Sequence, residues 1–363
     1  MSLPNAESVL NALRLVKDPD LHRDIVSLGF VKDVEISSEG EVSFTVELTT
    51  PACPVREELQ AQCESVVRDL PGVTAVQVTM TARVRERGPQ AENLVPGVKQ
   101  IIAVASGKGG VGKSTVTLNL AVALAQTGAR VGILDADVYG PSIPLMTGTH
   151  AERPLTQDER IIPITRFGVS MMSLGYLLED GQAVLWRGPM VAGTVKQLLS
   201  DVAWGNLDYL LVDLPPGTGD APMSLAQLVP LTGVLLVTTP HNVAANIAGK
   251  AAGLFRRLNS PILGVVENMA TYSCPTCGTV SRIFAGLRGD ELAQQLQVPF
   301  LGSIPLDPGV GAAADQGLPS VVADPNSAQA QAFRQVAGDL ARHVSIRSLA
   351  SAESSAEFRP VEG

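Results

Sequence analysis

The chain has 363 residues, of which 45% are hydrophobic, 17% charged and 4% aromatic, and its formal net charge is −9. This composition supplies enough apolar material for a buried core and excludes a wholly disordered chain. The length fits two domains of about 150 residues each. The acidic balance and the few aromatic side chains argue against a general nucleic-acid binder, which needs cations along the phosphates and aromatic faces for stacking.

The sequence also predicts the cellular location of the protein. It has no run of about 18 apolar residues, and its first residues lack the basic and apolar regions of a signal peptide. We therefore predict a cytoplasmic protein with no membrane partner. Four cysteines in that compartment do not make a disulfide framework, so a close cysteine pair indicates metal or redox chemistry.

Residues 1–87 predict a small α+β domain with the element order αββαβ. The predicted elements are a helix over 5–17, strands over 31–37 and 41–49, a helix over 54–70 and a strand over 73–84. Asn5 is the expected cap of the first helix. Residues 1–97 carry a net charge of −6 (9 Lys and Arg, 15 Asp and Glu) against −3 for the rest, which favours a separate N-terminal unit.

From residue 98 the pattern changes to short apolar strands that alternate with helices, up to about residue 345. Strands of this kind are buried on both faces, so they predict a mostly parallel sheet flanked by helices. Residues 88–97 have Pro and Gly at both ends and predict a linker. A last helix is predicted over about 327–343, and the small polar residues of 346–363 predict a disordered tail.

A phosphate loop is the clearest motif. Residues 107–114, GKGGVGKS, match G-x-x-x-x-G-K-[ST] between a predicted strand and a predicted helix. Glycines let consecutive backbone N–H groups converge on a phosphate, and the helix N-terminus adds its dipole. We predict that Lys113 contacts the β- and γ-phosphates and that Ser114 binds Mg²⁺. The predicted ATP-binding residues of the loop are Gly107, Lys108, Gly109, Gly110, Val111, Gly112, Lys113, Ser114 and Thr115.

Polar residues at the ends of later strands extend the predicted ATP and Mg²⁺ site. Asp213 follows four apolar residues, the pattern that holds a carboxylate near Mg²⁺. Asp135 and Asp137 follow another strand, and Asn268 ends a third. The carboxyl edge of an α/β sheet is where such folds bind ligands. As alternatives, each aspartate could cap a helix, and Asn268 could be a plain turn residue.

Cys274 and Cys277 form a C-P-x-C-G sequence, which is half of a metal knuckle. Three interpretations stay open on the residues alone. The pair could be a thioredoxin-like redox motif, part of a zinc knuckle completed by the distant Cys53 and Cys63, or a metal site shared across a dimer axis with two thiolates from each chain.

The order of these motifs resembles the Mrp/ApbC-type iron–sulfur cluster carrier ATPases, relatives of the ParA–MinD proteins. The matching segments, over about 98–325, are SGKGGVGKST, LDADVYGPSIP, WRGPM, DYLLVDLPPGTGD, VTTPHNVA, VVENM and CPTCG. Residues 8–85, with VKDPDLHRDIVSLGFV and TTPACP, resemble the MIP18-like iron–sulfur-assembly domain. The resemblance implies an α/β P-loop NTPase fold preceded by a small α+β domain.

The resemblance also implies a function. An ATP-hydrolysing homodimer would carry a [4Fe–4S] cluster and transfer it to apo iron–sulfur client proteins, with assembly factors as further partners. By the same resemblance Lys108 reaches the nucleotide of the opposite subunit, Asp137 orients the attacking water, and Asn268 bonds adenine. Lys108, Lys113 and Asp137 are thus the expected catalytic residues.

The number of thiolates that a cluster needs predicts how the cluster is bound and leaves other roles for the remaining cysteines. A [4Fe–4S] cluster takes about four thiolates, and two chains that each supply Cys274 and Cys277 would provide them across a two-fold axis. Cys53 either assists the cluster or a client, or is a small packed residue. Cys63, inside a predicted helix, is expected to be a packing residue.

Two alternative functions are a ParA/MinD-like partition or positioning ATPase and a zinc-binding nucleotide switch. A membrane-positioning relative of the ParA–MinD proteins would carry a basic amphipathic C-terminal helix, and a DNA-partition relative would carry a basic surface. The tail has few cations and the chain is acidic, so neither is favoured. A zinc-binding nucleotide switch stays open, because thiolates bind zinc and iron–sulfur units alike.

Overall fold

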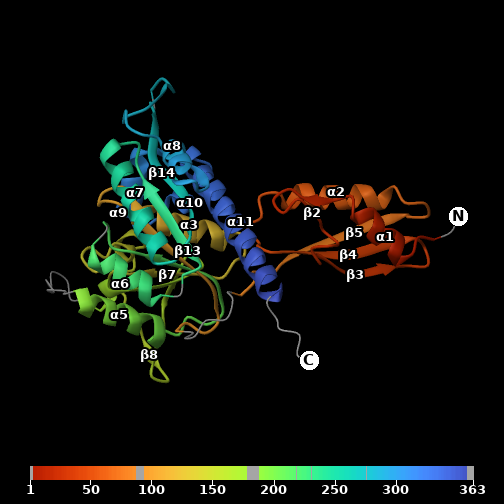
Figure 1. Ribbon diagram of the computed structural model, residues 1–363, viewed down its shortest axis with the longest axis horizontal. Helices are drawn as coiled ribbons and strands as arrows, with labels where there is room; N and C mark the ends of the chain where they lie inside the picture. Colours follow the sequence, from red (N-terminus) through yellow and green to blue (C-terminus); the bar gives the residue numbers. More distant parts are fainter. Residues whose placement is uncertain are drawn as a thin grey trace. The chain divides into compact units, whose positions relative to one another are not determined.

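The computed structural model divides the chain into two compact units (Figure 1). One unit consists of Met1–Arg85 together with Ala341–Gly363, and the other of Glu86–Leu340. We call them the N-terminal unit and the P-loop unit and describe each by itself. The structure describes residues 3–86, 94–177, 188–217, 219–229, 231–274 and 276–357.

The N-terminal unit begins with helix α1 (Ala6–Leu13). Asn5 caps it as predicted, because its side chain accepts from the Ser8 N–H at 2.8 Å while the Ser8 hydroxyl lies 3.0 Å from the Asn5 nitrogen. The helix ends earlier than the predicted residue 17. The residues that follow form a short antiparallel pair of strands, β1 (Lys17–Asp18) and β2 (Arg23–Asp24).

A sheet and one long helix complete this unit. Its strands lie in the order β3 (Val31–Ile36), β4 (Glu41–Leu48) and β5 (Ala75–Ala82). The β3–β4 pair is antiparallel and the β4–β5 pair parallel, with α2 (Arg56–Arg68) as the connection between β4 and β5. The predicted αββαβ order is therefore confirmed. Cys63 of α2 is fully buried in this core, as predicted, and burial raises the pKa of its thiol to about 12.

The P-loop unit is built on a mostly parallel sheet, as predicted. The strand order is β10-β11-β7-β12-β6-β13-β14-β15, with β16 also paired to β14. Only the β10–β11 and β14–β15 pairs are antiparallel among the described strands of this sheet. The strands are β6 (Val98–Ser106), β7 (Val131–Asp135), β10 (Ile164–Arg166), β11 (Val169–Ser173), β12 (Leu207–Asp213), β13 (Gly233–Thr238), β14 (Ile262–Ser273), β15 (Val280–Ser281) and β16 (Phe300–Leu306).

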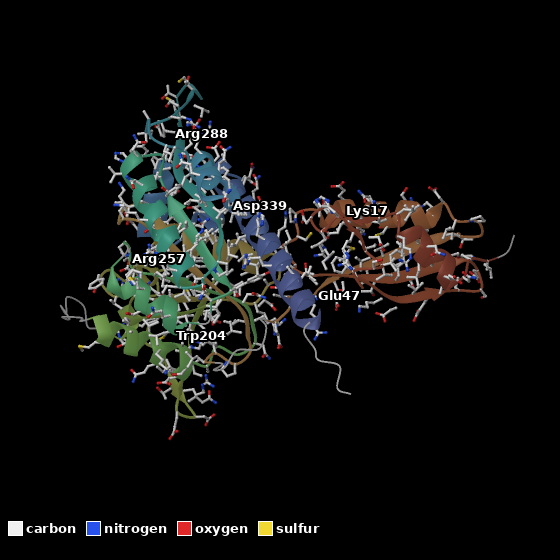
Figure 2. The ribbon with its side chains drawn as sticks, in the orientation of Figure 1. Lys17, Glu47, Trp204, Arg257, Arg288 and Asp339 are labelled. Carbon is white, nitrogen blue, oxygen red and sulfur yellow. The ribbon has the colours of Figure 1, made fainter. Side chains whose placement is uncertain are left out.

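Helices pack against these strands. Helix α3 contacts β7 and β12, α7 contacts β13, and α8 contacts β14 and β16. Trp204, labelled in Figure 2, is buried and donates its indole N–H to the Leu198 carbonyl at 3.3 Å. The helices are α3 (Lys113–Gln126), α4 (Ile143–Met146), α5 (Gly188–Asp201), α6 (Asp220–Leu228), α7 (Asn242–Arg257), α8 (Gly289–Leu296), α9 (Pro308–Asp315), α10 (Ser320–Ala323) and α11 (Ala328–Glu357). A short hairpin of β8 (Thr156–Gln157) and β9 (Arg160–Ile161) was not predicted.

The C-terminal region differs from the prediction. Helix α11 runs to Glu357, whereas the sequence predicted a helix to about 343 and a disordered tail over 346–363. Residues 358–363 of that predicted tail lie outside the described residues. The residues after Leu340 belong to the N-terminal unit, so the predicted P-loop domain ending at 345 also differs. The physical reason is packing: Val344 and Leu349 are 1% and 7% exposed, and small polar composition does not prevent a helix with such buried positions.

The predicted linker over 88–97 lies mostly outside the described residues. Its last part belongs to the P-loop unit, because Val95 is 1% exposed and the Gly97 carbonyl accepts from the Leu207 N–H at 3.0 Å. In the part of the chain that the structure describes, no helix is both long and apolar enough to cross a membrane.

Asp208 of β12 joins three neighbouring strands of the P-loop unit. Its carboxylate accepts from Lys99 Nζ of β6 at 2.8 Å, and from the Arg130 backbone N–H and guanidinium at 3.0–3.2 Å, directly before β7. Burial opposes ionisation, but the hydrogen bonds from Arg130 and Lys99 outweigh it and hold the pKa of Asp208 below its usual 3.8. The carboxylate therefore stabilises the fold in its ionised form.

We predict that Asp208→Asn lowers the free energy of unfolding by about 2 kcal/mol at about pH 7. Because the folded-state pKa is lowered, this contribution is present above about pH 4 and is lost as the pH falls through the lowered pKa. In urea denaturation, the difference in unfolding free energy between wild type and variant should therefore decrease toward about pH 3. Asp315→Asn, at the end of α9, is the control. A difference that stays constant with pH would contradict this account.

Candidate nucleotide and cysteine sites

The phosphate loop joins β6 to α3, and its backbone requires glycine at defined positions. Gly110 and Gly112 have φ of 79° and 81°, the left-handed region. A Cβ at Gly112 would lie 2.3 Å from Asn268 Nδ2, and a Cβ at Gly107 would lie 2.5 Å from the Ala248 nitrogen. A Cβ at Gly110 would meet no atom within 4 Å, so this part of the loop is open. The predicted loop thus has the form of a phosphate cradle.

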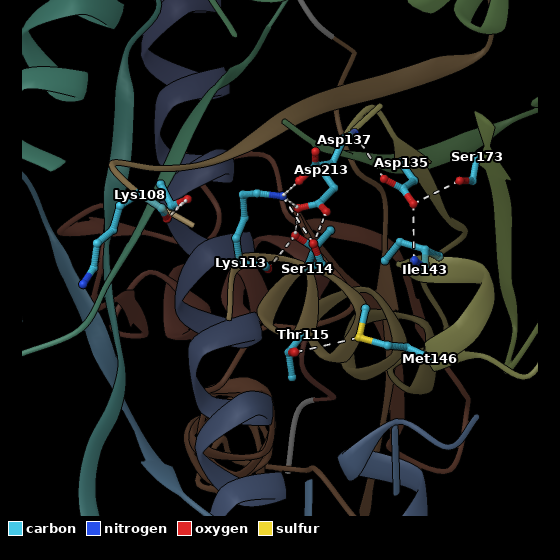
Figure 3. Close-up of polar contacts among 12 residues, drawn as sticks. Lys108, Lys113, Ser114, Thr115, Asp135, Asp137, Ile143, Met146, Ser173 and Asp213 are labelled. Carbon is cyan, nitrogen blue, oxygen red and sulfur yellow. Dashed lines mark hydrogen bonds and ion pairs between the residues drawn. The ribbon is translucent and has the colours of Figure 1, made fainter. Parts of the chain in front are cut away.

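Lys113 points from this loop into a cluster of carboxylates (Figure 3). Its Nζ lies 2.8 Å from Asp213 Oδ1 and 3.6 Å from Asp137 Oδ2. Lys113 is 5% exposed and Asp213 is fully buried. A buried lysine is stable only beside opposite charge. Here that charge comes from Asp213 at the end of β12 and from Asp137, two residues after the end of β7.

Asp213 lies at the centre of the carboxylate cluster around Lys113. The Ser114 hydroxyl donates to Asp213 Oδ2 at 2.5 Å, and the Thr117 hydroxyl lies 2.9 Å from Oδ1. Ser114 and Asp213 together supply the hydroxyl and carboxylate oxygens that Mg²⁺ prefers. The chemistry of these two side chains therefore fits a Mg²⁺ site.

Asp135 organises the loop that follows β7. Its carboxylate accepts from the backbone N–H groups of Asp137 and Ile143 at 3.2 and 3.3 Å and from the Ser173 hydroxyl at 3.0 Å. Burial, with the charge of Asp213, raises the pKa of Asp135 to about 7. Burial and Asp213 also raise the pKa of Asp137, while Lys113 opposes them. Asp135 therefore holds the segment that carries Asp137 against the cluster.

Other predicted loop contacts lie outside the carboxylate cluster. The Lys108 side chain points away from it in Figure 3, and no described residue provides an ion-pair partner for its ammonium. Asn268, 5% exposed, donates from Nδ2 to the Val111 carbonyl at 2.8 Å, so it contacts the phosphate loop itself. The Thr115 hydroxyl lies 3.8 Å from Met146 Sδ.

The cysteine pair lies directly beyond β14. The Cys274 N–H donates to the Thr279 carbonyl at 3.0 Å, and the Gly278 N–H donates to the Cys274 carbonyl at 2.8 Å. Gly278 has φ of 70°, which this tight turn requires. Cys277 is exposed, and its hydrogen bond with the Thr279 hydroxyl, at 3.2 Å, lowers the pKa of the thiol. The turn thus presents a thiolate-prone cysteine to solvent.

The structure brings together Lys113, Ser114, Asp135, Asp137 and Asp213, which the sequence placed in one site. Cys53 and Cys63 belong to the N-terminal unit, and the C-P-x-C-G turn belongs to the P-loop unit.

Three residues with contacts in these sites were not predicted from the sequence: Thr117, Ser173 and Thr279. Thr117 stands four positions after Lys113 on one helix face, and Ser173 ends a parallel strand, so both left a signal in the sequence. Thr279 left none.

A glycine loop between a strand and a helix, a buried lysine, and a carboxylate at the end of the adjacent strand define the class of P-loop NTPases. A family model described as NUBPL iron-transfer P-loop NTPase matches residues 97–341, and one described as iron-sulfur cluster assembly protein matches residues 6–79. The chain belongs to the family of NUBPL iron-transfer P-loop NTPases.

Individual relatives agree with this assignment. The iron-sulfur cluster carrier protein of Deinococcus radiodurans is 48% identical over 345 residues, which cover 94% of this chain and 97% of that protein. A nucleotide-binding protein from Archaeoglobus fulgidus, solved with ADP, is 42% identical with a TM-score of 0.55, over 61% of this chain and 87% of that one. The cell division ATPase MinD of Pyrococcus furiosus is 26% identical with a TM-score of 0.50, over 66% and 98%. The predicted fold class is confirmed.

We predict that Lys113→Ala lowers Mg²⁺-dependent ATP hydrolysis by about a hundredfold or more, because it removes the cation aimed at the developing phosphate charge. Release of inorganic phosphate measures it. Lys196→Ala, which removes an exposed lysine of α5, is the matched control and should hydrolyse ATP like the wild type. Unchanged turnover in Lys113→Ala would contradict the assigned role.

Proposed function

We propose that this chain is an ATP-hydrolysing carrier that binds an iron–sulfur cluster as a homodimer and transfers it to apo client proteins. The observation that carries the proposal is the position of the cysteine turn. It continues from β14, the strand whose Asn268 bonds the phosphate loop. The similarity to the iron-sulfur cluster carrier protein of Deinococcus radiodurans supports it.

Nucleotide handling is assigned to the carboxylate cluster. Lys113 would bind the β- and γ-phosphates, and Ser114 and Asp213 would hold Mg²⁺. Bound Mg²⁺ neutralises phosphate charge. Asp137 is 3.6 Å from Lys113 and its side chain is 13% exposed, a position from which a carboxylate can orient a water molecule.

The cluster is the cargo, and Cys274 and Cys277 bind it. Cys277 is exposed with a lowered thiol pKa, so it is readily available as a thiolate ligand. One chain supplies two thiolates, and a second copy related by a two-fold axis supplies the other two that a [4Fe–4S] cluster takes. The direction of Lys108, away from its own carboxylate cluster, agrees with a contact to the nucleotide of the other subunit. The cytoplasmic location and the lack of nucleic-acid and membrane partners stay predictions of the sequence.

We predict that Asp137→Ala retains nucleotide binding but loses hydrolysis, because its proposed task is to position water. Fluorescent-nucleotide titration and phosphate release separate the two effects. If ATP affinity collapses while turnover per bound ATP stays normal, Asp137 is a ligand or a structural residue instead.

We predict about one [4Fe–4S] cluster per dimer after anaerobic reconstitution. Iron and sulfide analysis with size-exclusion mass measurement should show the cluster lost in Cys274→Ala and in Cys277→Ala. Cys63→Ala is the matched control, because Cys63 is buried in the other unit. A cluster on a monomer, or one that survives both substitutions, would refute bridging. Stoichiometric zinc without iron would favour the zinc-binding nucleotide switch.

A further inference from the structure

Thr117 is a buried polar residue to which the nucleotide chemistry described above gives no task. It lies on α3, four residues after Lys113, and it is fully buried. Two acceptors lie within reach of its hydroxyl: Asp213 Oδ1 at 2.9 Å and the Lys113 carbonyl oxygen at 3.0 Å. A hydroxyl donates a single proton, so these two acceptors compete for it.

Asp213 is the stronger of the two acceptors. Its carboxylate is fully buried and has Lys113 Nζ at 2.8 Å as its cation. A hydrogen bond to an ionised oxygen is roughly twice as strong as one to a neutral oxygen. The bond from a helical threonine to the carbonyl four residues earlier is, by contrast, a local contact that slightly destabilises a helix. We therefore assign the Thr117 proton to Asp213.

The two carboxylate oxygens of Asp213 have different partners (Figure 3). Lys113 and Thr117 contact Oδ1, whereas Oδ2 accepts from the Ser114 hydroxyl. Lys113 and Ser114 each have a proposed ligand of their own, the phosphates and Mg²⁺. Thr117 has none, because it is fully buried on α3. Its bond to Asp213 therefore does not compete with the binding of either ligand.

We propose that Thr117 is a positioning residue for Mg²⁺ binding. Its hydroxyl holds Oδ1 of Asp213, so that Oδ2 stays beside Ser114, the other residue assigned to the metal. Without this bond the carboxylate is oriented less firmly, and Mg²⁺ binds more weakly. Binding of the phosphates by the backbone of the loop does not depend on the bond. The inference rests on the proposed role of Asp213 at Mg²⁺.

Mg²⁺ titrations of the full-length protein test this inference, with a fluorescent ATP analogue for binding and phosphate release for hydrolysis. Thr117→Val replaces the hydroxyl by a methyl group of similar size. The Mg²⁺ concentration at half-maximal effect should rise about tenfold or more in both assays, as expected when the hydrogen-bond partner of a metal-holding side chain is removed. With EDTA in place of Mg²⁺, the affinity for the analogue should equal that of the wild type. At saturating Mg²⁺, kcat should return to within about twofold of the wild type.

Two variants at the same position extend the test. Thr117→Ser keeps the hydroxyl and should restore the Mg²⁺ requirement to within about twofold of the wild type. Thr117→Ala should reproduce the rise seen in Thr117→Val, and it keeps the test available if a valine does not fit beside the carboxylate.

Thr127→Val is the matched control. The Thr127 hydroxyl donates to the Leu124 carbonyl at 2.7 Å at the C-terminal end of α3, a local contact without a carboxylate. This variant should need the same Mg²⁺ concentration as the wild type.

A wild-type Mg²⁺ requirement in both Thr117→Val and Thr117→Ala would overturn the inference. A loss of kcat that saturating Mg²⁺ does not restore would also overturn it, because that result indicates a structural role for Thr117. Asp213→Asn separates this inference from the proposed function. If its Mg²⁺ requirement is unchanged, the assignment of Asp213 to the metal is wrong. If it rises while that of Thr117→Val does not, only the positioning role of Thr117 is wrong.

Discussion

The P-loop unit depends on the compensation of charge around Lys113. Its buried ammonium lies between Asp213 and Asp137, with Asp135 buried beside them. A buried cation or carboxylate without a partner would be strongly destabilising, so the strands that carry these groups must be neighbours. The order β7-β12-β6 meets that requirement, because it places the ends of β7 and β12 next to the strand that leads into the phosphate loop. Excess negative charge at this point also fits a site for Mg²⁺.

Strand β14 connects the cysteine turn to the phosphate loop. Asn268 bonds the Val111 carbonyl, and the same strand ends at Ser273, one residue before Cys274. Between them Met269 has φ of 57°, and the register with β16 shifts between Asn268 and Tyr272. A change in the phosphate loop therefore has a short covalent and hydrogen-bonded connection to the cysteine turn. Any coupling between nucleotide and cluster would act in both directions, since linkage is reciprocal.

Sequence alone predicted the features that local patterns encode. The glycine loop, the strand-end aspartates and the αββαβ order each depend on spacing within a few residues, and each was found. The extension of α11 was missed, because Leu349 is buried beside residues of the same unit that are far away in the sequence, such as Leu48. The support of Asp213 by Thr117 was missed for a related reason: helical spacing places Thr117 beside Lys113, but only the fold shows that β12 ends there.

The most direct test of the account is transfer of the cluster itself. Protein reconstituted without oxygen would be mixed with the apo form of a [4Fe–4S] dehydratase in the presence of an iron chelator and MgATP, and the recovery of dehydratase activity followed in time. The account predicts faster recovery with the loaded protein than with the same amount of free iron and sulfide. Recovery no faster than with free iron and sulfide, or equal recovery with the Cys274→Ala, Cys277→Ala double variant, would contradict it.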